Sequence, residues 1–92
     1  MMKKKEKLPV IFRMEKYNGV RTPLAVFPTT NNTIYCMCYS HREQHSEICR
    51  GYYYQNTKPA TENEYKPLLK ELHKIGYTNL RIVKKWLDKY AG

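Results

Sequence analysis

Acidic residues are scarce in this chain, and it has no long apolar run. Eight Asp and Glu stand against seventeen Lys and Arg, so the 92 residues carry a formal net charge of +9 at neutral pH. No stretch approaches the roughly 20 consecutive apolar residues that a membrane-spanning helix needs. The basic N-terminus also lacks the apolar segment of a secretory signal. We therefore expect a cytoplasmic protein without a membrane partner.

Cysteine is scarce too, and its number is odd. Three cysteines cannot all pair within one chain, which favours free thiols in a reducing compartment over a disulfide scaffold. The sequence has no glycine-rich phosphate loop, RNP-like segment, helix-turn-helix spacing, zinc-finger pattern or internal repeat. No short motif therefore assigns the chain to a nucleotide-binding or nucleic-acid-binding class.

The chain does have enough apolar sequence for one folded domain. Its apolar fraction is 41%, and a chain of 92 residues rarely holds two cores. We expect residues 1–8 to form a flexible basic tail and residues 9–92 to form a single α+β domain. The predicted architecture is a three- to four-stranded, mainly antiparallel sheet packed against one main α-helix.

Alternating apolar residues predict three strands, over residues 9–16, 20–27 and 34–39. The first strand is expected to be half-buried, with Arg13 and Glu15 on its polar face. Asn18-Gly19 predicts a tight hairpin after it, and Pro23 belongs at an edge or strand end because it cannot donate to a ladder. The third strand is apolar on both faces, which predicts a central position.

Residues 61–76 carry the clearest helical pattern. Thr61 and Glu64 match a capping box, and Gly76 stands where a left-handed cap belongs. Pro67 is expected either to distort the first turn or to delay the regular helix to about Tyr65. The predicted core places Leu68, Leu69, Leu72 and Ile75 of this helix against Phe12, Val26, Ile34 and Ile82.

The remaining segments are less regular. A short helix capped by Ser40 is expected over residues 40–51, a short strand or aromatic connection over 52–54, and a loop over 56–60. Residues 80–83 predict a last strand, but a continuous helix over residues 79–90 fits the apolar spacing nearly as well.

The positive charge lies at the two ends of the chain. Residues 1–21 carry +5, residues 22–65 carry −1 and residues 66–92 carry +5. If both ends fold onto one face, that face would attract polyanions, whereas lysines on a helix surface also serve solubility alone. The candidate polyanion-binding residues are Lys66, Lys70, Lys74, Arg81, Lys84, Lys85, Arg42 and Arg50. Some of the nine tyrosines offer surfaces for base stacking, although most are expected to fill half-buried positions.

A cluster of Cys and His lies between residues 36 and 49. Zinc takes four thiolate or imidazole ligands, and the candidates are Cys36, Cys38, His41 and His45, with Cys49 as a further one. Alternatively, the thiols pack in the core while the histidines hydrogen-bond across a loop. A thiol nucleophile activated by a histidine is a third alternative, but no orienting acid or oxyanion hole is recognisable. We therefore expect no enzyme, and no cofactor unless zinc binds.

Seven groups of residues form one pattern over about residues 9–85. They are Val10-Ile11-Phe12-Arg13, Val26-Phe27-Pro28, Cys38-Tyr39-Ser40-His41 with Gln44-His45, Thr57-Lys58-Pro59-Ala60, Glu64-Tyr65, Ile75-Gly76-Tyr77 and Leu80-Arg81-Ile82-Val83. The pattern resembles a family of small uncharacterised proteins carried by phages and mobile elements of gut bacteria, which has no assigned activity. The resemblance implies a mobile-element accessory protein and singles out His41, Gln44 and His45. Cys49 is not part of the pattern.

These observations together predict a small, basic, non-enzymatic accessory or binding protein. Its expected partner is nucleic acid or an acidic protein that meets the basic face. Two alternatives remain, namely a zinc-stapled module built on residues 36–49 and an inhibitor of a host protein.

Overall fold

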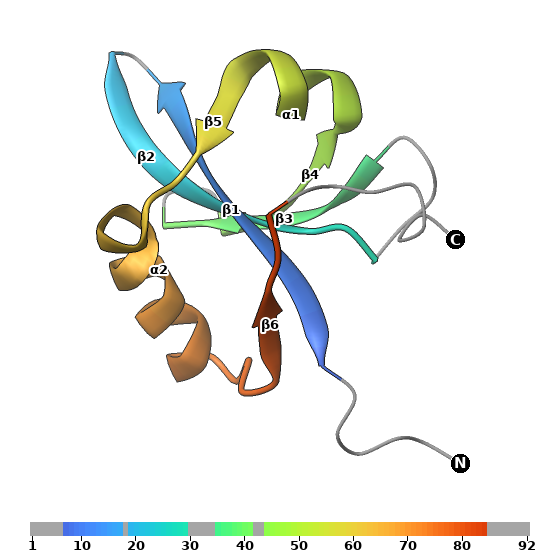
Figure 1. Cartoon of the computed structure of the whole chain (residues 1–92), viewed down its shortest axis with the longest axis vertical. Coiled ribbons are helices and arrows are strands. Elements are labelled where there is room, and N and C mark those ends of the chain that lie inside the picture. The colour runs from blue at the N-terminus through green and yellow to red at the C-terminus, as the bar shows by residue number, and fades with distance from the viewer. Residues whose placement is uncertain (1–6, 18, 30–34, 42–43, 85–92) are drawn as a thin grey trace.

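The computed structural model describes residues 7–17, 19–29, 35–41 and 44–84. Along the chain (Figure 1) these residues form β1 (Leu8–Tyr17), β2 (Val20–Phe27), β3 (Tyr35–Ser40), β4 (Gln44–Cys49), α1 (Arg50–Asn56), β5 (Thr57–Pro59), α2 (Glu62–Lys74) and β6 (Leu80–Ile82). The predicted α+β fold with a mainly antiparallel sheet is confirmed. The sheet has six strands rather than three or four, and a second helix, α1, accompanies α2.

Five antiparallel strands lie in the order β4-β3-β2-β1-β5. Strands β1 to β4 each pair with their neighbour in sequence. β5 then returns to β1, and β6 pairs in parallel with residues Leu8 to Val10 of β1. Backbone bonds from Ala60 to the Phe12 carbonyl and from Val83 to the Val10 carbonyl show that β5 and β6 share one edge of β1.

The first hairpin is as the sequence predicts. Tyr17 pairs with Val20 across a two-residue turn, and Gly19 has a φ of 81°, which glycine adopts without steric cost. Pro23 precedes the ladder between β2 and β3, which begins at Leu24. Pro23 lies within β2 and pairs with Met14 of β1 alone, so its missing N–H interrupts no pairing with β3, as expected for an edge position.

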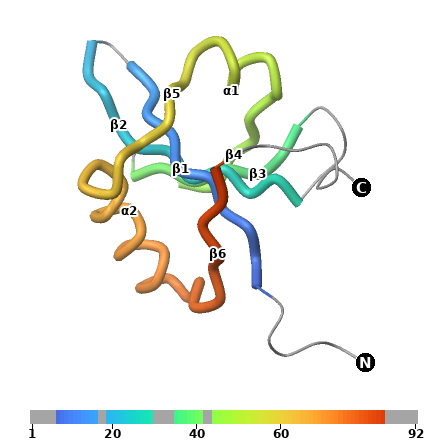
Figure 2. Tube along the Cα trace, in the orientation of Figure 1, coloured from blue at the N-terminus to red at the C-terminus, as the bar shows by residue number. Residues whose placement is uncertain are grey.

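Each face of the sheet carries its own hydrophobic core, because side chains alternate along every strand. Figure 2 shows the strands between the two helices. On one face, α2 packs Leu68 and Leu72 against Val10, Phe12, Ala25, Phe27 and Tyr39. On the other face, Tyr53 of α1 packs with Ile11, Leu24, Val26, Cys36, Cys38 and Ile48. β3 contributes to both cores and has a neighbour on each side, which confirms its predicted central position.

The predicted core is correct only in part. Leu68 and Leu72 are fully buried, but Ile75 is 48% exposed and Ile82 is 44% exposed. Val26 pairs with Ile11 across the ladder and therefore faces α1 rather than α2. Ile34 lies outside the described residues.

The prediction for residues 40–60 is wrong. Residues 44–49 form β4 instead of continuing a helix from Ser40, and α1 begins only at Arg50. The three consecutive tyrosines lie in α1, and β5 occupies most of the expected loop. The alternation of β4 is hidden in the sequence because Ile48 is its one buried residue. β6 confirms the strand alternative for residues 80–82. Its partner Leu8, which the sequence assigns to the tail, opens β1.

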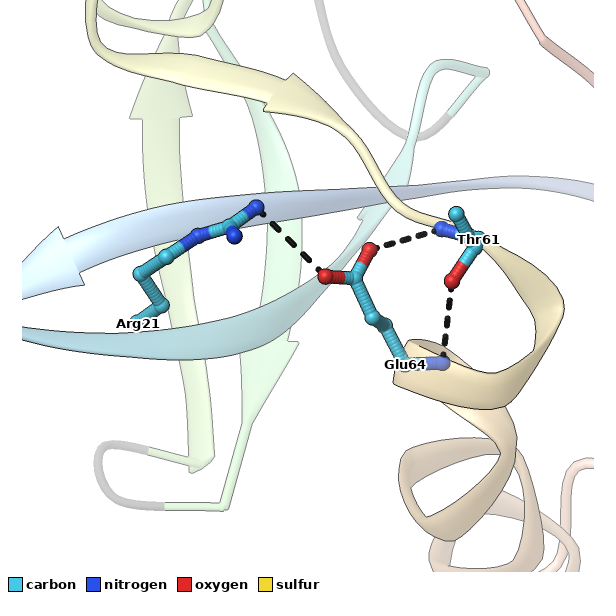
Figure 3. A network of polar contacts seen from close by, with 3 residues as sticks. All are labelled: Arg21, Thr61 and Glu64. Carbon is cyan, nitrogen blue, oxygen red and sulfur yellow. Dashed lines mark hydrogen bonds and ion pairs between the residues drawn. The ribbon is translucent and has the colours of Figure 1, made fainter.

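Helix α2 begins and ends as its sequence predicts. The N–H of Glu64 donates to Oγ1 of Thr61 at 3.3 Å, and the N–H of Thr61 donates to Oε1 of Glu64 at 2.9 Å. Figure 3 shows that the second carboxylate oxygen of Glu64 also reaches Arg21 on β2, at 3.5 Å. The hydrogen bond from the Thr61 N–H is the main cause that lowers the pKa of Glu64. Gly76, with a φ of 119°, follows the last turn.

Pro67 lies inside α2, so the expected delay of the helix to Tyr65 does not occur. The proline has no N–H to offer the carbonyl of Asn63, and the helix tolerates this loss near its exposed N-terminal end. No helix among the described residues has the length and the apolar character that crossing a membrane requires.

Arg13 is a buried cation that joins β1 to α1 and β5. Its guanidinium lies over the ring of Tyr53, 4.3 Å from the centroid. Its Nε donates to Oγ1 of Thr57 and its Nη2 donates to the Thr57 carbonyl, both at 2.8 Å. The predicted polar face of β1 is therefore buried, at 9% exposure for Arg13 and 8% for Glu15, because α1 and β5 fold over it.

We expect Arg13→Lys to lower the free energy of unfolding by about 2 kcal/mol. A lysine ammonium cannot donate to both oxygens of Thr57 while lying flat on Tyr53, so buried acceptors lose partners. Urea unfolding measures the loss. Arg21→Lys, at an exposed ion pair, is the matched control and should change stability by less than about 0.5 kcal/mol. Equal losses at the two positions would contradict the role given to Arg13.

Candidate functional site

An open cavity of about 480 Å³ lies where the β3–β4 hairpin meets the C-terminal end of α2. Its volume falls within the range of roughly 300–1,000 Å³ that is usual for small-ligand sites. The lining residues come from the hairpin and from the turn after α2, and they are Tyr39, Gln44, His45, Ile75, Gly76 and Tyr77.

Strand alternation places the hairpin side chains at this cavity. Tyr39 and His45 are partners in the β3–β4 ladder, so both point to the α2 face of the sheet. Their rings meet edge to face with centroids 4.9 Å apart. Tyr77, which follows α2, stacks on Phe27 with ring centroids 5.2 Å apart. Its hydroxyl lies 2.9 Å from Nε2 of His45, within hydrogen-bond distance.

Glu71 of α2 is held by two side chains beside the cavity. The hydroxyl of Tyr39 donates to Oε2 of Glu71 at 2.5 Å, and Nδ1 of His41 pairs with Oε1. These contacts, that of Tyr39 first, hold the pKa of Glu71 below its ordinary value. The same hydrogen bond to the carboxylate raises the pKa of Tyr39. The ionised carboxylate thus fixes the hairpin to the helix.

The site brings together the three residues that the family resemblance singles out. Gln44 and His45 line the cavity, and His41 lies beside it on Glu71. Sequence reasoning did not identify Glu71 and Tyr77 as members of this site. Each lies about 30 residues after its partner on the hairpin, and no local motif spans such a gap.

Gln44 has a backbone conformation that is unusual for its residue type. Its φ of 58° is positive, which the described chain shows at no other non-glycine residue. The left-handed conformation costs a residue with a Cβ roughly 1–2 kcal/mol, and glycine avoids this cost. Gln44 directly follows the β3–β4 turn, and its side chain is exposed. The strain therefore lies at the rim of the cavity.

The sheet separates the four candidate zinc ligands. Cys36 and Cys38 lie in the core under α1, whereas His41 and His45 contact Glu71 and Tyr77 on the α2 side. Burial raises the pKa of Cys36 to about 12. The thiol is therefore protonated at neutral pH, whereas zinc binds the thiolate.

The described part of the chain holds no group of three His, Cys, Asp or Glu residues that could bind a metal ion. The four candidates thus do not form one zinc site within the described residues, and the same separation removes the thiol–imidazole pair that nucleophilic catalysis would need. The geometry agrees instead with the alternative of core thiols and hydrogen-bonded histidines. Cys49 lies at the N-cap of α1, where its sulfur accepts from the N–H of Tyr52 at 3.5 Å.

The candidate cations lie on more than one surface. Lys66, Lys70 and Lys74 are exposed on α2. Leu80 packs into the core under α2 and Val83 packs on the core under α1, so Arg81 between them points to the α1 side. Arg50 opens α1, and Lys84 is exposed after β6. Arg42 and Lys85 lie outside the described residues.

Comparison with known proteins gives no match: no family model, no curated protein and no solved structure is similar to the chain. The resemblance to mobile-element proteins therefore stays a prediction. Function is inferred below from the contacts, burial and charges of the described residues.

We expect Glu71→Gln to weaken the acid sensitivity of the fold. The folded state lowers the pKa of Glu71, so its ionised form stabilises the protein above the ordinary value of 4.5. This contribution is lost as the pH falls through the lower folded-state pKa. Melting temperatures between about pH 6 and pH 3 should therefore fall more steeply for wild type than for the variant. Glu47→Gln, an exposed carboxylate on β4, is the control and should stay parallel to wild type.

We expect Gln44→Gly to stabilise the protein by about 1 kcal/mol, because glycine adopts the positive φ without the steric cost of a Cβ. For a domain of this size the melting temperature should rise by roughly 4–8 °C. Gln44→Ala removes the same polar group but keeps the Cβ, so it should give no such rise. A rise in both variants would show that the side chain, rather than the backbone, is the source of the strain.

Proposed function

We propose that the protein is a small non-enzymatic binding protein that holds a polyanion, with nucleic acid as the leading candidate. The contact surface is the lysine row of α2, defined as Lys66, Lys70 and Lys74. Each lysine follows the previous one by four residues, so the row runs along about 12 Å of one helix side.

The lysine row lies on the solvent side of α2. Leu68 and Leu72, which pack on the sheet, project from the opposite side of the helix. Each lysine of the row is exposed. The row is therefore free to meet a partner without any change in the core.

The observation that carries the proposal is that the lysines of α2 form no ion pair with the acidic residues of the same helix. Glu64 and Glu71 lie on the flank that meets the sheet and are engaged by Arg21 and by His41. No lysine of the described residues takes part in an ion pair. Lys74 is near enough to Glu71 to help lower the pKa of that carboxyl. Three exposed lysines that form no ion pair can contact phosphate, and such contacts release counterions.

We expect the variant Lys66→Gln/Lys70→Gln/Lys74→Gln to lose most of its affinity for duplex DNA and heparin. For duplex DNA, the slope of log affinity against log salt should become less steep by about 2 to 3, since each lysine that contacts phosphate contributes about 0.9. Fluorescence anisotropy between about 0.05 and 0.2 M salt measures both quantities.

The matched control is Lys7→Gln/Lys16→Gln/Lys58→Gln, which removes the same charge at three exposed positions outside α2. It should retain most of the affinity and of the slope. Equal losses in the two variants would show that binding follows total charge, and wild-type binding that ignores salt would end the proposal.

A further inference from the structure

We infer that the cavity between the β3–β4 hairpin and α2 binds an unstacked nucleobase, so that the polyanion is a single-stranded nucleic acid. This inference rests on the proposed function and names its ligand. Three features support it. They are a fixed aromatic ring in the cavity, an exposed amide at its rim, and the last lysine of the lysine row next to it in sequence.

The ring of Tyr77 provides a surface on which a base can stack. Phe27 covers one face of this ring in a near-parallel stack, with 16° between the ring planes. Tyr77 also lines the cavity, so a ligand that enters the cavity meets this residue. Single-strand binding proteins use such rings because every base has a π-face.

The neighbouring side chains hold their positions without a ligand. The centroid of the His45 ring lies 6.0 Å from that of Tyr77, and Tyr39 is 3% exposed and hydrogen-bonded to Glu71. A ligand that enters a preformed site loses little affinity to ordering side chains. The carboxylate of Glu71 is engaged by its two partners and does not line the cavity.

Gln44 supplies the polar contact at the rim. Its amide has both donors and an acceptor, which match the edge of a base and do so best with two bonds to adenine. The backbone of Gln44 has a positive φ, which glycine would adopt at a lower steric cost. Backbone strain of this kind concentrates at ligand-binding positions.

Lys74, the last residue of the lysine row, brings the row to the cavity. It is the last residue of α2, and Ile75 and Gly76, which line the cavity, follow it directly. A strand that follows the row can therefore place a phosphate at Lys74 and turn the adjacent base toward Tyr77. A duplex keeps its bases paired and stacked, so the cavity selects a single strand.

The test compares two labelled strands of about ten nucleotides, one with mixed bases and one abasic throughout. Both carry the same phosphate charge, so they differ only in the bases. Wild type should bind the base-bearing strand at least about five-fold more tightly, which is the lower limit for one stacked base. Tyr77→Phe keeps the ring and should keep the preference, whereas Tyr77→Leu should abolish it.

Gln44→Ala makes the test independent of the stability of Tyr77→Leu, because Gln44 is exposed. It should reduce the preference for the base-bearing strand at least two-fold and leave the affinity for the abasic strand unchanged. Equal binding of both strands by wild type, or an unchanged preference in Gln44→Ala, would overturn the base site and leave the polyanion proposal standing. Binding of neither strand would overturn the polyanion proposal itself.

Discussion

The hydrogen bonding of β1 to three other strands is the constraint on which the rest of the structure depends. β2 takes one edge of β1, while β5 and β6 share the other. Helix α2 connects β5 to β6, so it must lie over one face of the sheet and end near the last strand. This path brings its C-terminal turn to the β3–β4 hairpin. The position of the cavity and the outward direction of the lysine row thus both follow from the pairing of β1.

The alternation of side chains then sorts the reactive groups. Cys36 and Cys38 differ by two residues and fall on the α1 side, while His45, opposite Tyr39, falls on the α2 side. Groups that are close in sequence are therefore separated by the thickness of the sheet. A shift of the β3–β4 register by one residue would exchange the faces of β4 and bring His45 to the thiols. Ile48, whose burial under α1 requires the observed register, prevents that shift.

Sequence alone predicts the elements that carry local signals. The capping box of α2 and the glycine of the first hairpin are examples, because a few adjacent residues determine each. The sequence leaves residues 79–90 open between a strand and a helix, because β6 pairs with the distant start of β1. β4 and α1 could not be predicted, since polar residues dominate β4, α1 is short, and the burial of both depends on distant partners. Arg13 shows the same limit, because only α1 and β5 make a charged residue of β1 part of the interior. In the candidate site, the sequence names His41 and His45 only as metal ligands or hydrogen-bonding loop residues, and the family resemblance alone adds Gln44. Glu71 and Tyr77 could not be predicted, because their contacts with the hairpin span about 30 residues.

The parallel pairing of β6 has a consequence for the order of assembly. Among the described residues, the ladder partners of Leu8, Pro9 and Val10 are residues 80–82, because the ladder with β2 starts at Ile11. During synthesis on the ribosome, the start of β1 therefore waits until β6 has emerged, because Leu8 and its partner Leu80 are 72 positions apart. Such non-local contacts form slowly, since the entropy of closing a long loop must be overcome first. The start of β1 is thus completed only after β6, and a nascent chain that stops after α2 leaves Leu8 to Val10 without their strand partner.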